Sequence, residues 1–404
     1  MGPISRAHAE VDDREAKEPE YGSRTPWLKH FVFRAPHLIP PREFLYGTHY
    51  ARRYLSTTFG PGGGGKSSLS IVEVLAMATG RPLLGIRPTG QYRVAYWNGE
   101  DPLDEIERRI GAAILHFGLD GRALQEWLFW GSGREEDLII AEQTREGTTI
   151  HAPVVNRVTD FVRNNRIDAV IIDPFVSSHR VTENDNGSIN QVAKTWAMVG
   201  ENTNAAIELN HHTRKGSGQE LTVEDGRGAV ALLAAARSAR VINPMTNEQA
   251  TKAGVENRRA YFQASNGKAN LAPPPDKGDW YRFESKELGN GDSVGVVTGW
   301  SWPDPFDDVN TADVARIQQA IEGGQWRENI QSKEWVGYAV GKALDLDIGS
   351  GDKIRDRPAQ RKARAKVKGL IKTWLPTGVL ATEMMPDQKR NLRPHVVVGT
   401  RIAP

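Results

Sequence analysis

One short stretch has the residue types and spacing of a phosphate-binding site: several glycines followed by a lysine and two serines. The sequence Gly60-x-x-x-x-Gly65-Lys66-Ser67 fits the pattern G-x-x-x-x-G-K-[ST]. Glycines let backbone N–H groups converge on phosphate oxygens, the lysine reaches the β- and γ-phosphates, and the serine hydroxyl can ligate Mg²⁺. The pattern predicts a nucleotide site built from Gly60, Gly62, Gly63, Gly64, Gly65, Lys66, Ser67 and Ser68.

Two carboxylates follow apolar runs that read as strands. Asp173 ends "DAVIIDP", where an acid can hold Mg²⁺ together with Ser67; its alternative role is to begin a turn before Pro174. Glu100, in "YWNGED", follows a strand and precedes a helix that we expect Asp101 to cap. Glu100 can orient or deprotonate an attacking water, or it can simply stabilise the helix dipole.

A histidine pair stands at the end of another expected strand, in "LNHHTRKG". On an extended segment His211 and His212 point to opposite sides, so they are a poor pair for one metal ion. One of them can sense the γ-phosphate, and the other is then structural.

The elements that must position these residues alternate along the chain. Apolar strand-like runs such as "YRVAYWNGE" and "IDAVIIDPF" are separated by stretches with helical spacing, such as "KSSLSIVEVLAMATG". This order predicts an α/β fold around a mostly parallel sheet. From about Ala229 the runs "ARSARVI", "RAYFQAS", "DWYRFES" and "SVGVVTGWSW" predict an antiparallel extension of that sheet.

The end of the chain predicts a further small domain at 310–404, after a linker at 302–308. Helical stretches are expected at 311–323 and 331–344, then a basic helix at 358–374 and a two-strand wing, an order typical of a winged helix. The basic run 353–372 can be a solvated helix face or a surface that contacts a polyanion.

Composition limits the classes of protein. The chain has 404 residues, no cysteine and a net charge of +2, which excludes disulfides and Cys-ligated zinc and favours a reducing, cytoplasmic setting. No apolar run approaches the roughly 20 residues of a membrane span, so no membrane partner is expected. Residues 1–35 are charged and read as a flexible tail.

The ordered motifs resemble those of a known family. "GPGGGGKSS", "YWNGEDP", "VIIDPF", "NHHTRKG", "GRGAVALLAAARSARV" and "SNGKANLAP" are together similar to the RepA-type hexameric helicases among the RecA-like P-loop ATPases, over roughly residues 36–275. The resemblance implies a RecA-like ATPase domain at 36–303, ATP and Mg²⁺ as cofactors, and a homo-oligomer, a hexamer, with ATP sites between subunits. It also implies single-stranded DNA as a partner inside the ring.

The resemblance also implies a role for each matching residue. Lys66 and Ser67 match the P-loop pair, Asp173 the acid linked to Mg²⁺, and Glu100 the catalytic glutamate. His212 matches the second His of the sensor, and Arg237 an arginine finger that acts across the subunit interface. The rivals for that last role are Lys215, Arg227 and Arg240.

Two departures keep the function open. The compact RepA helicases lack a segment like 310–404, and the loop 213–226 is rather acidic for a DNA grip. A ring motor that unwinds DNA, an ATP-switched DNA-binding regulator or loader, and a recombinase-like or defence-type ATPase without unwinding all remain compatible with the motifs.

Overall fold

The computed structural model describes residues 28–213, 220–225, 229–273, 275, 277–352, 355–386 and 391–402. By its internal contacts the chain divides into two units, Met1–Arg42 and Glu43–Pro404. The described part of the first unit holds one short 3₁₀ helix, η1 (Pro36–Leu38), and otherwise has no regular secondary structure.

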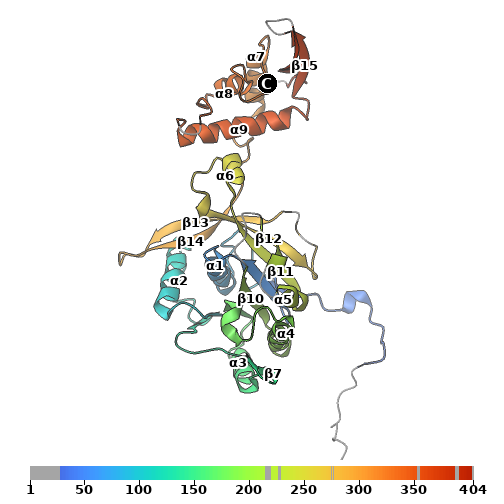
Figure 1. The fold of residues 1–404 in the computed structure, drawn as a ribbon, viewed down its shortest axis with the longest axis vertical. Coiled ribbons are helices and arrows are strands. Elements are labelled where there is room, and N and C mark those ends of the chain that lie inside the picture. The colour runs from blue at the N-terminus through green and yellow to red at the C-terminus, as the bar shows by residue number, and fades with distance from the viewer. Residues whose placement is uncertain are drawn as a thin grey trace, which may run out of the picture. The chain divides into compact units, whose positions relative to one another are not determined.

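A nine-stranded sheet forms the centre of the second unit (Figure 1). Its order is β14 (Ser293–Trp300), β13 (Asp279–Glu287), β12 (Tyr261–Ala269), β11 (Ser238–Pro244), β3 (Leu55–Gly60), β10 (Ala206–His212), β8 (Ala169–Asp173), β4 (Val94–Asn98) and β5 (Leu128–Ser132). The strands from β11 to β5 are parallel and the other three antiparallel, which confirms the predicted α/β class. One detail of the prediction was wrong: β11 pairs in parallel with β3, so the antiparallel part begins only at β12.

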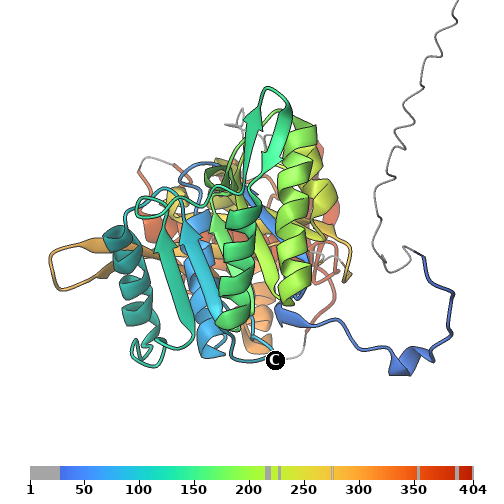
Figure 2. The same ribbon diagram turned by 90° about the horizontal axis from the view of Figure 1, so that it is seen from below.

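Helices cover both faces of the parallel strands (Figure 2). On one face lie α1 (Lys66–Thr79) and α2 (Leu103–Phe117); on the other lie α3 (Ala152–Asn164), α4 (Asn186–Thr203) and α5 (Ala229–Ala235). In β8, Ala169 and Ile171 enter the core with α1 and α2, whereas Val170 and Ile172 enter the core with α3 and α4. This burial of both faces explains the continuous apolar run of that strand.

Several smaller elements complete this region. They are β1 (Phe44–Tyr46) paired with β2 (Tyr50–Ala51), a three-stranded sheet of β6 (Ala141–Thr144), β7 (Gly147–Ile150) and β9 (His179–Arg180), the helix α6 (Asn247–Ala253), and the 3₁₀ turns η2 (Phe175–Ser178), η3 (Val223–Asp225) and η4 (Arg258–Ala260). The sequence reasoning had not identified them, because each is only two to seven residues long.

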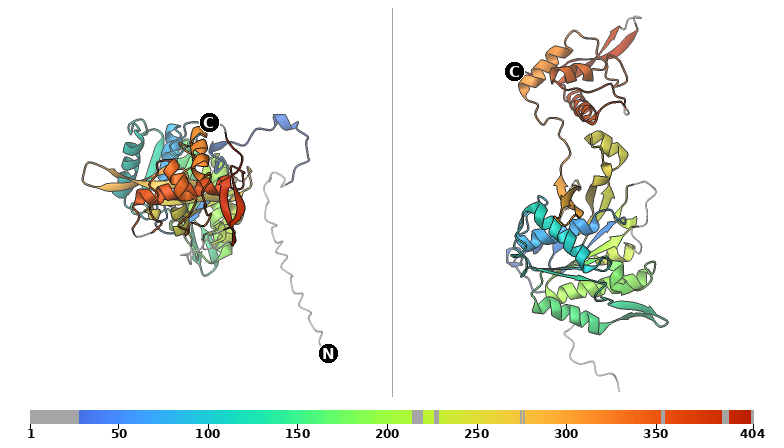
Figure 3. Two further views of the ribbon diagram at one scale, coloured as in Figure 1. Left: turned by 90° about the horizontal axis from the view of Figure 1, so that it is seen from above. Right: turned by 90° about the vertical axis from the view of Figure 1, so that its left-hand side faces the viewer.

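The C-terminal segment folds into a group of helices and a hairpin (Figure 3), and its apolar side chains form a separate hydrophobic core. It contains α7 (Thr311–Ile321), α8 (Gly337–Ala343), α9 (Pro358–Trp374) and the hairpin of β15 (Leu380–Pro386) and β16 (Leu392–Val398). Trp326 forms an isolated antiparallel bridge with Val396 of the hairpin. The basic helix begins and ends where expected, whereas the helix expected at 331–344 is shorter. The winged-helix type remains a prediction.

Candidate active site

The glycine-rich loop joins the end of β3 to the start of α1. Gly63 and Gly65 have φ angles of 71° and 106°, in the left-handed region that favours glycine. A Cβ added to Gly65 would lie 2.9 Å from the ring of Phe262, so a side chain there would also be crowded out. The loop and the first turn of α1 line a pocket of about 670 Å³, a size suited to a nucleotide.

Lys66 lies at the floor of this pocket and is only 4% exposed. Its Nζ donates to the carbonyl oxygens of Gly60 (2.8 Å) and Pro61 (3.1 Å), and it lies 3.0 Å from Nδ1 of His212. Burial lowers the pKa of Lys66 to about 8, although the carboxylates of Asp173 and Glu100 act in the opposite direction. The ammonium group can therefore bind an anion in this pocket, but it loses its proton at a lower pH than the ammonium group of an exposed lysine does.

Asp173 ends β8 and is 2% exposed. The hydroxyl of Tyr96, on the adjacent strand β4, donates a hydrogen bond of 2.8 Å to Oδ2 of Asp173. Burial raises the pKa of Tyr96 well above its usual value, so this hydroxyl keeps its proton and remains a donor. The carboxylate is thus fixed in direction by a neighbour that sequence reasoning had missed.

Glu100 is positioned by its backbone. Oδ1 of Asn98 accepts hydrogen bonds from the backbone N–H groups of Glu100 (2.9 Å) and Asp101 (2.8 Å), which folds the chain into a tight turn after β4. Burial, then the charges of Asp173 and Asp101, raise the pKa of the Glu100 carboxyl, while Lys66 lowers it. The Glu100 Oε1 lies 3.7 Å from Nε2 of His212.

The structure corrects one prediction at this turn. α2 begins at Leu103 with Pro102 in the N-cap position, so Asp101 does not cap the helix. Asp101 instead pairs with Arg109 of α2 at 3.0 Å. Arg108 and Arg109 both line the pocket, and neither was predicted from the sequence. The signal that could have found them is their place in the helix that directly follows Glu100.

Lys66, Glu100, Asp173 and His212 therefore meet at the carboxyl edge of the parallel strands, which is where open α/β sheets bind their ligands. His211, by contrast, is buried and packs edge-on against the rings of Phe59 and Phe175, at 5.7 and 5.8 Å. One histidine of the pair was expected to have a structural role, and the buried position of His211 agrees with that role.

The two described candidates for the arginine finger, Arg237 and Arg240, do not line this pocket. Arg237 is exposed and directly precedes β11, and its N–H donates to the carbonyl of Leu55 at the start of β3. Arg240 is buried and its guanidinium donates to both carboxylate oxygens of Glu73 at 2.6 Å. The structure does not bring Arg240 to the pocket. Lys215 and Arg227 lie outside the described residues.

The residues present fit a nucleotide with Mg²⁺. The described parts of the chain contain no group of three or more His, Asp or Glu residues that could hold a metal ion alone. Mg²⁺ at nucleotide sites is usually bound through one or two carboxylates, substrate phosphates and water, so Asp173 and the hydroxyl of Ser67 are the residues that would hold it here. Among the described helices, none is long and apolar enough to cross a membrane.

Comparison with known proteins supports a P-loop ATPase. Residues 24–218, slightly less than half of the chain, match a family described as an AAA domain. No curated protein matches the chain. A solved structure of the RadB recombinase is similar over 62% of this chain and 93% of that chain, with 12% identity and a TM-score of 0.40. A likeness this distant says nothing about function.

Proposed function

We propose that the chain is an ATP-hydrolysing, DNA-associated ring motor of the RepA-like helicase type. The observation that carries this proposal is the division of the predicted residues between two edges of one sheet. Lys66, Glu100, Asp173 and His212 converge at the carboxyl edge, whereas Arg237 stands at the amino edge.

The distance between these edges argues for assembly. Arg237 is tied to Leu55, and β3 runs from there to Gly60, a span of roughly 17 Å at about 3.3 Å per residue. That span is too long for Arg237 to reach phosphates in its own pocket. An arginine finger at this position would act in the pocket of a neighbouring copy, as a ring or another head-to-tail assembly requires.

Each residue has a proposed share in hydrolysis. Lys66 and the loop N–H groups hold the phosphates, and the raised pKa of Glu100 suits a general base that orients and deprotonates water. Asp173, with Ser67, would hold Mg²⁺, which supplies positive charge beside the phosphates. His212 contacts both Lys66 and Glu100, so a shift of His212 when the γ-phosphate binds or leaves would be transmitted to both residues.

The test is the ATPase rate of an oligomeric preparation with and without single-stranded DNA, together with a strand-separation assay. We expect DNA-stimulated hydrolysis and unwinding, and Lys66→Ala should lose nucleotide binding. If the wild-type protein hydrolyses ATP but neither responds to single-stranded DNA nor separates strands, the helicase assignment fails. Unchanged turnover in Lys66→Ala would instead contradict the active site itself.

A second candidate, an ATP-switched DNA-binding regulator or loader, is favoured by one observation. In the C-terminal segment, a groove of about 1140 Å³ near the basic helix α9 and the hairpin is lined by four cations, Arg327, Lys368, Lys372 and Arg393, and by two acids, Glu328 and Glu334, of which Glu334 pairs with Arg327. The remaining excess of positive charge suits a polyanion such as duplex DNA. This candidate predicts slow hydrolysis and duplex binding that is lost when residues 310–404 are deleted.

A further inference from the structure

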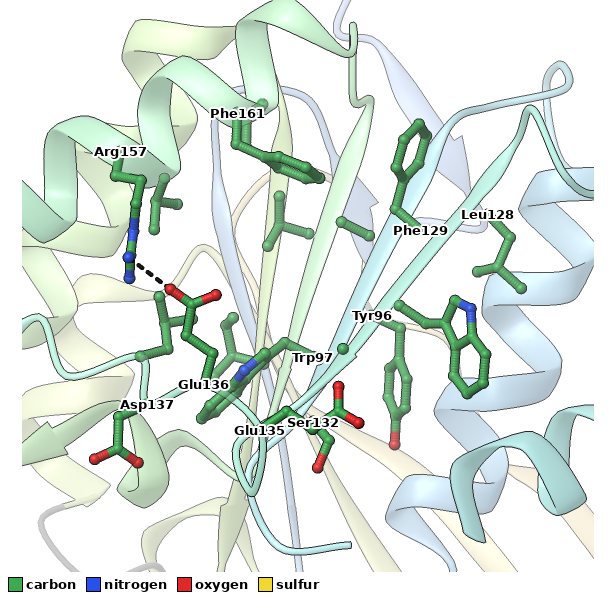
Figure 4. A pocket seen from close by; sticks show the side chains of 18 of the residues that line it. Tyr96, Trp97, Leu128, Phe129, Ser132, Glu135, Glu136, Asp137, Arg157 and Phe161 are labelled. Carbon is green, nitrogen blue, oxygen red and sulfur yellow. Dashed lines mark ion pairs between the residues drawn. The ribbon is translucent and has the colours of Figure 1, made fainter. Parts of the chain in front are cut away.

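A groove of about 710 Å³ lies between β4, β5 and α3 (Figure 4). The indole ring of Trp97, on β4, lies at one end of the groove near Ser132 of β5, whereas Phe129 and Phe161 lie at the other end. Trp97 is partly buried and packs against the core that includes α3 and α4. Because Trp97 is only three positions before Glu100, this end of the groove adjoins the turn that carries the proposed general base.

The ring of Trp97 packs directly on the backbone at two positions. A Cβ added to Gly99 would lie 2.9 Å from Cη2 of the ring, and a Cβ added to Gly133 would lie 2.9 Å from Cζ2. The same Cβ on Gly133 would lie 2.8 Å from Cα of Gly99, so the two glycine backbones also touch. The ring, the residue before Glu100 and the residue after β5 therefore form one close-packed contact.

Three consecutive residues, starting with the last residue of β5, hold the turn through its carbonyl oxygens. The three hydrogen bonds, each with its donor first, are Ser132 Oγ to Asp101 (2.6 Å), the N–H of Gly133 to Asn98 (2.8 Å) and Arg134 Nε to Glu100 (2.6 Å). Ser132 is 3% exposed, and its hydroxyl also accepts a hydrogen bond from the N–H of Arg134 at 3.1 Å. Because this buried hydroxyl both donates and accepts, it has a fixed direction.

The strand on the other side of β4 holds the turn as well. The N–H of Gly99 donates to the carbonyl oxygen of Asp173, at the end of β8, at 2.8 Å. By contrast, the side chain of Glu100 is 59% exposed, and its Oε1 lies 3.7 Å from Nε2 of His212, too far for a hydrogen bond. The position of the carboxylate therefore follows the position of the backbone that carries it.

We propose that Trp97 and Ser132 are positioning residues for Glu100: the ring and the hydroxyl hold the turn where the carboxylate can reach the attacking water. This inference rests on the proposed function, in which Glu100 is the general base. A base must come within about 2.6–3.2 Å of the proton that it takes, and a misplacement of about 1 Å can cost roughly 100-fold in rate. Neither Trp97 nor Ser132 lines the nucleotide pocket, so nucleotide affinity should not depend on them.

The first experiment removes the ring and then supplies it again. Trp97→Ala should lower kcat for ATP hydrolysis by about 10- to 100-fold and leave the dissociation constant for ATP unchanged. The variant has a cavity that opens onto the groove, and engineered apolar cavities bind small aromatic molecules. Saturating free indole should therefore restore most of the lost rate.

Trp130→Ala is the matched control for the rescue, because Trp130 lines the same groove and is 38% exposed. It should hydrolyse ATP at the wild-type rate with and without indole. Wild-type turnover in Trp97→Ala would overturn the role of the ring, and so would a loss of rate that indole does not repair.

The second experiment tests Ser132 through Glu100. Ser132→Ala removes the hydrogen bond to Asp101 and should lower kcat by about tenfold with ATP affinity unchanged. In a Glu100→Gln background, which lacks the base, the same substitution should have no further effect. Thr159→Val is the control, since it removes another buried hydroxyl that donates to a backbone carbonyl, and it should keep the wild-type rate. Equal losses from Ser132→Ala in both backgrounds would overturn the proposal.

The same variants distinguish failure of this inference from failure of the proposed function. If Glu100→Gln alone hydrolyses ATP at the wild-type rate, the role of Glu100 as general base is wrong, and the proposed mechanism fails with it. If Glu100→Gln is inactive while Trp97→Ala and Ser132→Ala both keep the wild-type kcat, the mechanism stands and only the positioning role is wrong.

Discussion

At the scale of single residues, the proton on Lys66 decides how the pocket responds to pH. Burial lowers the pKa of Lys66 to about 8. Phosphate binds the ammonium form, so nucleotide affinity should be constant below this pKa and fall as pH rises through it, by up to about tenfold per pH unit. We expect this in titrations of nucleotide binding between pH 7 and 9.5.

Lys66→Arg is the control for that titration. Arginine keeps its charge over the whole range, so this variant should bind more weakly overall but show no loss of affinity near pH 8. A wild-type affinity that is equally flat up to pH 9.5 would show that Lys66 does not titrate in this range.

Tyr96 should act through Asp173 rather than on the substrate. Tyr96→Phe removes the only hydroxyl that the described residues place on Asp173 Oδ2. Loss of such a supporting hydrogen bond typically costs 10–100-fold in metal affinity or activity. We expect the Mg²⁺ concentration for half-maximal turnover to rise by about tenfold, with metal-free nucleotide binding unchanged.

The matched control is Tyr92→Phe, whose hydroxyl bonds to Thr89 outside the pocket. This variant should leave the Mg²⁺ dependence as it is. If Tyr96→Phe and Tyr92→Phe behave alike, the hydrogen bond to Asp173 has no part in holding the metal.

These residues also show what could be predicted from the sequence. Lys66, Ser67, Glu100 and Asp173 could be predicted as site residues because each stands in a local pattern of loop, strand end or helix start. Tyr96 was not found, since its partner Asp173 is 77 positions away and only the pairing of β4 with β8 brings them together. The pairing of Arg240 with Glu73 could not be predicted for the same reason, because nothing local reveals that the two residues face each other.

At the scale of elements, the pair of Arg240 and Glu73 joins β11 to α1 inside the core. Both side chains are almost fully buried, and the guanidinium also donates to Thr58. Removing one member leaves an uncompensated buried charge, which typically costs 3–5 kcal/mol. We therefore expect Arg240→Met to lower the free energy of unfolding by about 3–5 kcal/mol in chemical denaturation.

Removing both charges should cost much less than removing one. The double variant Arg240→Met/Glu73→Leu leaves no unpaired ion, and such replacements are often neutral or stabilising. Recovery of most of the lost stability in the double variant is the expected result. If the double variant is as unstable as the two single variants added together, the pair is not energetically coupled.

The elements were more predictable than their partners. Strands buried on both faces and helices with an apolar stripe carry their pattern locally, so β8, β10 and α9 appear close to their expected bounds. The neighbour of a strand has no such signal. β11 was expected in an antiparallel extension because it opens the strand-rich half, yet it lies parallel to β3.

At the scale of the whole molecule, the basic helix can be tested through salt. Lys362, Lys368 and Lys372 of α9 are exposed, whereas Arg364 is buried against the ring of Trp335. If the exposed lysines contact phosphates, log affinity for DNA falls steeply with log salt, by about 0.9 per contact. Replacing all three by alanine should make this slope less steep, by up to about 0.9 for each lysine that contacts a phosphate.

Arg122, Arg145 and Lys194 provide the control for the salt experiment, because they are also exposed and lie on the ATPase part of the chain. Replacing these three removes the same net charge and should leave the slope as it is. A wild-type affinity that does not depend on salt would point to a protein partner for α9 instead of DNA.

Arg237 allows the proposed assembly to be tested by mixing two inactive proteins. Arg237→Ala keeps its own pocket but should lose about 10³–10⁵ in hydrolysis rate, the usual contribution of an arginine finger. Lys66→Ala has no working pocket but still carries Arg237. If the finger acts in trans, mixed assemblies contain intact pockets beside intact fingers, and random mixing at equal amounts restores roughly a quarter of the wild-type rate. If Arg237 acts within its own chain, no interface in the mixture is complete and the rate stays at the level of the separate variants.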